Sequence, residues 1–121
     1  MATVLIVDDS PVNRSLLRKL LETEGYEVIA EATNGKEGYD EFVKHSPDIV
    51  TLDVSMPEMN GIEALKLMNS HNPGAKIIIL SAESEREKKE EALKCGADEF
   101  VTKPYKKSDI LEAIKRCLEC S

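Results

Sequence analysis

Five short runs of aliphatic residues, separated by longer segments with helical spacing, constrain the fold of this chain more than any other feature. The runs are TVLIV (3–7), EVIA (27–30), DIVTLD (48–53), AKIIIL (75–80) and EFVT (99–102). Runs this continuous and rich in β-branched residues are typical of strands buried on both faces of a parallel sheet. Since strand and helix alternate five times, the pattern predicts a doubly wound α/β fold with right-handed crossovers.

The segments between the runs carry apolar stripes and helix-start signals. Ser10 followed by Pro11 is typical of a first helical turn, and Asn34 with Glu37 has capping-box spacing. The stripes at helical spacing indicate four amphipathic helices. They comprise Val12, Leu16, Leu17, Leu20 and Leu21; Gly38, Tyr39, Phe42 and Val43; Ile62, Leu65 and Met68; and Ile110, Leu111, Ile114, Cys117 and Leu118.

Length and composition indicate a soluble globular protein. The 121 residues suit one domain, which we place at 1–121, and 41% of them are apolar while 32% are charged. No apolar run approaches the roughly 18 residues that span a bilayer, and no secretory signal is visible, so we expect a cytoplasmic protein without membrane contact. The net charge of −7 argues against nucleic-acid binding. We expect Cys95, Cys117 and Cys120 to be buried or idle thiols.

Polar side chains follow four of the five predicted strands. Asp8 and Asp9 end the first run, with no basic residue near them in sequence, and Asp53 ends the third. Ser81 ends the fourth run and Lys103 follows the fifth. Because the carboxyl ends of parallel strands share one edge, where open α/β sheets bind ligands, we expect these five side chains to converge.

Three clustered carboxylates require a cation. Oxygen ligands select a hard ion, so the pattern predicts a Mg²⁺ site, half of it from Asp8 and Asp9 and completed by Asp53. Any single aspartate at a strand end is explained more simply as a turn or a helix cap. The convergence of all five residues on one edge favours the metal site.

The motifs VLIVDDS, PDIVTLDVSMPEMNGIEAL, IIILSA and GADEFVTKPY, with the spacing between them, resemble the response-regulator receiver domains of two-component signalling. The resemblance covers the chain from Met1 to about Cys120 and is strongest to the stand-alone chemotaxis regulators, the CheY-like proteins. It implies a flavodoxin/CheY-like sheet of five parallel strands in the order 2-1-3-4-5, with five helices. The strand order then reverses between the first and third strands, which carry the three aspartates.

The resemblance also implies a phosphoryl-transfer site. Asp53 would accept a phosphoryl group from a phosphohistidine of a sensor histidine kinase. Mg²⁺, with Mn²⁺ as a substitute, would be bound directly by Asp9, by Asp53 and by the backbone carbonyl of Ser55, whereas Asp8 would act mainly through water. Lys103 would pair with the phosphoryl oxygens.

Further residues acquire roles by resemblance. Ser81 would hydrogen-bond the phosphoryl group and move toward it, while Phe100, where many relatives have Tyr, would turn inward; an ordinary core role for Phe100 is an equally good reading. Ser55 and Glu83 would tune the lifetime of the phosphoryl group. The Lys103–Pro104 peptide bond would be cis.

The expected function is a signalling switch that assists only its own phosphorylation and autodephosphorylation. Output would pass by protein contact through the face formed by the fourth helix, fifth strand and fifth helix. The charged segment 83–94 is either a solvated helix face or part of that docking surface. We expect a monomer in chemotaxis, with a flagellar motor switch protein as target; a phosphorelay intermediate is the alternative.

Two other classes of protein share this sheet. An aspartyl-nucleophile phosphatase of the haloacid dehalogenase type needs Asp-x-Asp after the first strand, whereas Asp8 and Asp9 are adjacent. A flavodoxin-like module needs a first loop that cradles phosphate with backbone N–H groups, and two carboxylates are unsuited to that task. Phosphorylation of Asp53 would indicate a receiver, and phosphorylation of Asp8 a phosphatase.

Overall fold

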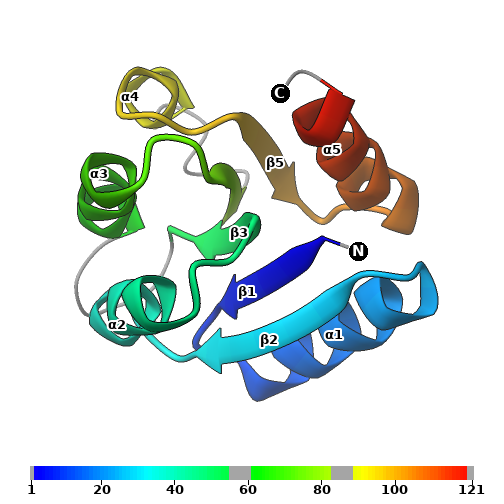
Figure 1. Cartoon of the computed structure of the whole chain (residues 1–121). Helices are drawn as coiled ribbons and strands as arrows, with labels where there is room; N and C mark the ends of the chain where they lie inside the picture. The colour runs from blue at the N-terminus through cyan, green and yellow to red at the C-terminus, as the bar shows by residue number, and fades with distance from the viewer. Residues whose placement is uncertain (1, 55–60, 83–88, 120–121) are drawn as a thin grey trace.

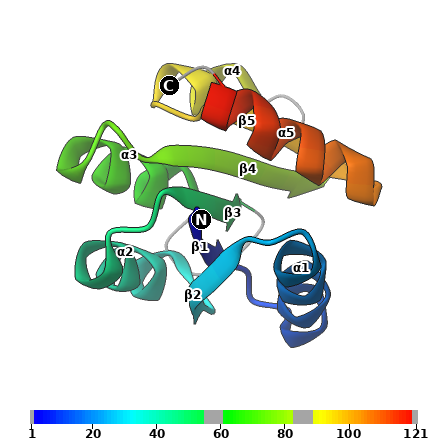
Figure 2. The same ribbon diagram turned by 45° about the vertical axis from the view of Figure 1, so that its right-hand side comes forward.

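A single parallel sheet lies between two layers of helices in the computed structural model, which describes residues 2–54, 61–82 and 89–119 (Figures 1 and 2). The strands pair in the order β2-β1-β3-β4-β5, and every neighbouring pair is parallel. The predicted doubly wound fold and its strand order are confirmed. The elements are β1 (Thr3–Val7), α1 (Pro11–Thr23), β2 (Glu27–Ala32), α2 (Gly35–His45), β3 (Ile49–Asp53), α3 (Gly61–His71), β4 (Lys76–Ala82), α4 (Lys89–Lys94), β5 (Glu99–Lys103) and α5 (Lys107–Glu119).

The core has two parts, one on each face of the sheet. Figure 1 shows α1 and α5 on one face and α2, α3 and α4 on the other. Alternate residues of a strand serve opposite faces: in β1, Leu5 packs toward Phe42 and Met68, whereas Ile6 packs toward the cluster that contains Leu17. Both faces of β1 are therefore buried, which explains why the run that forms it is aliphatic without interruption.

The apolar stripe of α1 is only partly buried, contrary to a simple reading of its spacing. Leu17 and Leu21 are buried against the sheet, but Val12 and Leu16 are 65% and 63% exposed. The five apolar residues of this helix span too wide an arc for one sheet-facing side. By contrast, the stripe of α3 (Ile62, Leu65 and Met68) is buried as predicted.

The turn between β1 and α1 is short and tightly bonded. Ser10 is the N-cap of α1, since its hydroxyl accepts a hydrogen bond from the Asn13 N–H, and Pro11 is the first helical residue. The Ser10 N–H donates to Asp8 Oδ1 at 2.8 Å. Helix α1 thus starts immediately after the acid pair and fixes the direction in which the chain leaves it.

None of the described helices has the length and apolar character that a membrane span requires.

Candidate functional site

Three aspartates meet at the carboxyl edge of the sheet. Asp8 and Asp9 follow β1, and Asp53 is the last residue of β3, the neighbouring strand. Each offers one carboxylate oxygen, and these oxygens lie within 4.8 Å of one another. Asp8 and Asp53 are buried, whereas Asp9 is exposed. Burial of two like charges this close together is unfavourable unless positive charge is supplied.

Lys103 supplies part of that charge from the end of β5. Its Nζ donates a hydrogen bond to Asp53 Oδ2 at 2.9 Å and lies 4.0 Å from Asp8 Oδ2. Burial alone would lower the pKa of this ammonium, but the hydrogen bond and the charge of Asp53, with that of Asp8, outweigh it and raise the pKa. Lys103 is therefore held as a cation against the acidic cluster.

Asp8 is the acid whose charge is least well compensated. Burial raises the pKa of its carboxyl, and repulsion from Asp53 and Asp9 adds to that, while the hydrogen bond from Ser10 and the charge of Lys103 act in the opposite direction. Its Oδ2 is buried and has no hydrogen-bond partner among the described residues. A buried, unpartnered carboxylate oxygen is costly, so this atom points to a cationic ligand.

The residues at this edge fit a hard divalent cation. Three carboxylates face one ammonium, so the cluster retains excess negative charge, and oxygen atoms are the ligands that Mg²⁺ prefers. The neighbourhood of Asp8, Asp9 and Asp53 predicted from strand order is thus present, with Lys103 beside it.

Comparison with known proteins identifies the family. Residues 4–115 match the response regulator receiver domain. The chain belongs to that family. It is 45% identical over 113 residues to the chemotaxis protein CheY of Thermotoga maritima, with 93% of this chain and 94% of that protein covered. It is 41% identical to the chemotaxis protein CheY of Bacillus subtilis, with 95% and 96% covered.

Solved structures of receiver domains share the fold closely. A CheY-like receiver domain from Methanospirillum hungatei has a TM-score of 0.91 at 31% identity, with 98% of this chain and 94% of that chain covered. The matching chain in a CheX–CheY–BeF3–Mg²⁺ complex from Borrelia burgdorferi has a TM-score of 0.92 at 32% identity, with 97% and 89% covered. The resemblance to receiver domains, and to CheY-like ones in particular, is confirmed.

The structure describes some of the other residues predicted for the receiver domain, and the rest lie outside the described residues. Ser81 is fully buried near the end of β4, and its hydroxyl donates to the carbonyl of Ala82 at 3.2 Å. Phe100, in β5, is half-buried and packs against the core beneath α2, α3 and α4. The Lys103–Pro104 peptide bond is cis. Ser55 and Glu83, and the first half of the charged segment 83–94, lie outside the described residues.

A groove beside Lys103 was not foreseen from the sequence. This open hollow of about 480 Å³ lies between α1 and the start of α5. Its lining is mostly apolar, with lysines at one side, and comprises Asn13, Leu16, Leu17, Leu20, Lys103, Pro104, Tyr105 and Lys107. The sequence signal was the width of the apolar stripe on α1, which exceeds what one sheet-facing side can bury.

Arg14 was also missed. The acid pair has no basic neighbour in the two or three residues on either side, yet Arg14 reaches back from the first turn of α1 and donates to the carbonyl of Asp8 at 2.7 Å. Arg14 lies five residues beyond Asp9 in the sequence, and its contact with Asp8 was not predicted. The signal in the sequence was a cation one helical turn after the N-cap, on a helix that begins directly behind the acids.

Proposed function

We propose that this receiver domain is a phosphorylation-activated switch that accepts a phosphoryl group on Asp53 from a sensor histidine kinase, with Mg²⁺ bound. The observation that carries the proposal is the contact of Lys103 Nζ with Asp53 Oδ2, at 2.9 Å, inside a cluster of three carboxylates. Similarity to CheY proteins of Thermotoga maritima and Bacillus subtilis supports a role in chemotaxis. The protein assists its own phosphorylation and autodephosphorylation and has no further enzymatic activity.

The chemistry requires charge neutralisation more than bond-making groups. A carboxylate oxygen of Asp53 attacks phosphorus as the bond from phosphorus to the donor imidazole nitrogen breaks, and the electron pair of that bond stays on the imidazole. Lys103 keeps its proton and moves its hydrogen bonding toward the transferred oxygens. Catalysis of such a loose transfer is almost entirely positioning and electrostatics.

A charge tally explains the need for a metal. A phosphoryl group carries about −2, so with Asp8 and Asp9 the phosphorylated site holds about four negative charges against the single ammonium of Lys103. Asp9 and Asp53 are the proposed direct ligands of Mg²⁺, with Asp8 acting through water; the backbone carbonyl of Ser55 is the fourth proposed contributor. When bound, the cation supplies two further positive charges, and Mn²⁺ can substitute for it.

Activation is proposed to pass through Ser81 and Phe100. The Ser81 hydroxyl would leave the Ala82 carbonyl for a phosphoryl oxygen, and Phe100, now half-buried, would fill the space. Phe100 also lines a small hollow on the β5–α5 surface with Asp109, Glu112 and Arg116. A change at Phe100 would therefore alter the proposed output face formed by α4, β5 and α5, with Ser55 and Glu83 tuning how long the change lasts.

The target on that face is proposed to be a protein, with a flagellar motor switch component as the first candidate. The Borrelia burgdorferi structure, a complex of CheY with CheX, supports protein contact as the mode of output. Onward transfer of the phosphoryl group to another histidine protein is the second candidate. We infer further that residues 1–121 act as one monomeric domain in the cytoplasm, in keeping with the similarity to CheY.

The groove beside Lys103 is proposed to receive the phosphodonor protein. Val12 and Leu16 on α1 are exposed, and Leu16 lines the groove at the edge of the acidic site. An apolar groove that extends to Lys103, the hydrogen-bond partner of Asp53, can hold a donor helix while its histidine approaches Asp53.

Mapping the modified residue tests the proposal. The purified protein is treated with a kinase phosphodomain and with a small acyl phosphate, and the label is located by mass spectrometry. We expect label on Asp53 only, none in the Asp53→Asn variant and none in EDTA. Label on Asp8 would indicate the phosphatase alternative, and labelling at full rate in EDTA would refute the mechanism.

A further inference from the structure

We propose that Arg14 is a positioning residue that fixes the peptide group between Asp8 and Asp9 and thereby sets the affinity of the acidic cluster for Mg²⁺. The inference rests on the proposed function in one respect, namely that the cluster binds the cation. Arg14 does not itself supply a ligand. It acts on the backbone that aims two of the three carboxylates.

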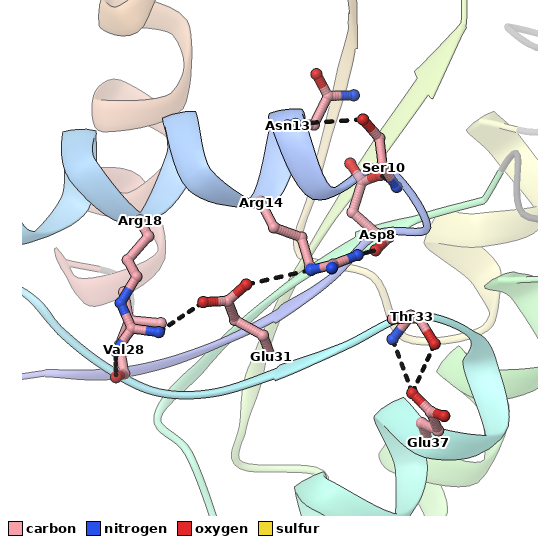
Figure 3. A network of polar contacts seen from close by, with 9 residues as sticks. All are labelled: Asp8, Ser10, Asn13, Arg14, Arg18, Val28, Glu31, Thr33 and Glu37. Atoms are coloured by element: carbon pink, nitrogen blue, oxygen red, sulfur yellow. Dashed lines mark hydrogen bonds and ion pairs between the residues drawn. The ribbon is translucent and has the colours of Figure 1, made fainter.

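The guanidinium of Arg14 bridges two parts of the molecule. Its Nη1 donates to the Asp8 carbonyl oxygen at 2.7 Å, and its Nε donates to Glu31 Oε1 at 3.2 Å (Figure 3). Glu31 lies on β2, the strand beside β1, so the bridge ties the β1–α1 turn to the sheet. The Arg14 side chain is only 16% exposed, which favours a defined geometry over that of a solvated surface ion pair.

A second arginine binds the Glu31 carboxylate, which anchors Arg14 to β2. Arg18, one turn further along α1, donates from Nη1 to Glu31 Oε2 at 2.5 Å (Figure 3). Its Nε donates to Glu22 Oε2 at 3.2 Å. Each oxygen of the Glu31 carboxylate therefore has its own arginine partner. Arg18 shares the anchor with Arg14 but makes no contact with Asp8 in this network (Figure 3), which makes it a natural control.

The contact to the Asp8 carbonyl matters because a peptide group is planar. Fixing its oxygen fixes the whole plane that links the Cα atoms of Asp8 and Asp9. Asp8 is already held by its N–H, which donates to the Ala32 carbonyl at 3.0 Å, and by its Oδ1, which accepts from Ser10. Arg14 restrains the carbonyl, so that the buried Oδ2 is left to face the cluster.

Asp9 depends on this restraint more than Asp8 does. Its side chain is exposed, so packing does little to hold it, and its direction follows from the backbone that carries it. Rotation of the Asp8–Asp9 peptide would carry the Asp9 carboxylate away from Asp53. Partners that orient metal ligands from behind typically contribute 10- to 100-fold to metal affinity.

Metal affinity of three variants provides the test, measured by calorimetry with Mg²⁺ and by electron paramagnetic resonance with Mn²⁺. We expect Arg14→Ala to weaken binding about tenfold, and the control Arg18→Ala to weaken it less than about twofold. Arg14→Lys keeps the charge, but one ammonium cannot make both contacts of the planar fork, so we expect binding about fivefold weaker than in the wild type. Thermal unfolding in EDTA reports any loss of stability separately.

Each outcome bears on a distinct claim. Wild-type affinity in Arg14→Ala, or in Arg14→Lys should the alanine variant fail to fold, would overturn the positioning role. Equal weakening by Arg14→Ala and Arg18→Ala would also overturn it, because general loosening of α1 would then explain both. Absence of Mg²⁺ binding by the wild-type protein would instead refute the proposed function.

Discussion

Asp8 combines structural and functional demands in one side chain. Its N–H, its carbonyl and its Oδ1 each have a hydrogen-bond partner, so the residue is rigidly placed, while Oδ2 is buried and has no such partner within the part of the chain that the structure describes. Rigid placement of an unpartnered oxygen is unfavourable for folding and favourable for binding a cation. The acid pair at the end of β1 is therefore explained by the ligand it would bind and not by its contribution to the fold.

Cys117 illustrates a residue whose chemistry is suppressed by the fold. It faces the sheet from α5, and burial, with smaller effects from Asp98 and Glu99, raises the pKa of its thiol from 9.0 to about 12. Because the unfolded thiol ionises first, this group favours the folded state fully below pH 9, and that contribution is lost as the pH rises toward 12.

We predict that Cys117 is inert in the native protein. In a Cys95→Ser/Cys120→Ser variant, a thiol-specific disulfide reagent at pH 8 should react with Cys117 at least about a hundredfold more slowly in buffer than in guanidinium, since the thiolate is the nucleophile. Absorbance of the released thiol measures the rate. Comparable rates in the two solvents would show that the burial of Cys117 is not maintained.

At the scale of elements, helix α1 has one side packed on the sheet and another side exposed. Leu17 and Leu21 pack on the sheet, whereas Val12 and Leu16 remain exposed, and Leu16 lines the groove. Between these sides, Arg14 and Arg18 connect the helix to β2. The helix thus contributes at once to the core, to the placement of the acids and to the surface proposed for the phosphodonor protein.

The exposed side of α1 gives a prediction about partner recognition. We expect Leu16→Asp to slow phosphorylation by a kinase phosphodomain about tenfold or more while leaving phosphorylation by a small acyl phosphate unchanged, since only the protein donor needs the groove. The matched control is Leu67→Asp, because Leu67 is exposed on α3, away from the groove. Equal slowing of phosphorylation with both donors would mean that Leu16 supports the phosphorylation site itself and does not contribute to docking of the protein donor.

The packing of α2 on β1 gives a prediction about stability. A Cβ atom added at Gly38 would lie 2.9 Å from Val7 Cγ2 and 3.0 Å from Val7 Cγ1, and Val7 immediately precedes the acid pair. Alanine is the better helix former by about 1 kcal/mol. We nevertheless expect Gly38→Ala to destabilise the protein by about 1–2 kcal/mol, because the stiff valine cannot move aside. Urea unfolding measures the change, with Gly74→Ala, in an exposed loop, as control.

How far the sequence predicts these elements depends on the kind of information involved. Strands buried on both faces leave an unbroken aliphatic run, so β1 was placed to the residue, and the other four strands differ from prediction by at most two residues at an end. The aspartates and Lys103 followed from the rule that parallel strands end at one edge. Which leucines of α1 would be buried, and that Arg14 would turn back to Asp8, depend on helix rotation and side-chain reach, which spacing does not encode.

The fold of the whole molecule concentrates unfavourable charge repulsion at one edge of the sheet. Strand order places β1 beside β3, and Lys103 reaches across from β5, so three carboxylates and one ammonium are concentrated at that edge. The rest of the fold, with its two-sided aliphatic core, must compensate for the repulsion. Binding of a cation at this edge would for this reason also stabilise the fold.

That linkage predicts opposite effects of one substitution in two buffers. In EDTA, Asp8→Asn removes a buried charge but keeps an acceptor for the Ser10 N–H, so we expect it to stabilise the protein by about 1 kcal/mol, or roughly 4 °C in Tm. Mg²⁺ at ten times its Kd should stabilise the wild type by about 1.4 kcal/mol and the variant far less, because one of the negative charges that face the cation has been lost. The stability advantage of the variant over the wild type should therefore shrink or reverse when Mg²⁺ is added.

Calorimetry measures the stability of both proteins in the two buffers, with Asp40→Asn, which changes an exposed acid of α2, as the control. A variant less stable than the wild type in EDTA would mean that the Asp8 charge is already compensated within the fold, and that the acidic edge needs no cation to balance it.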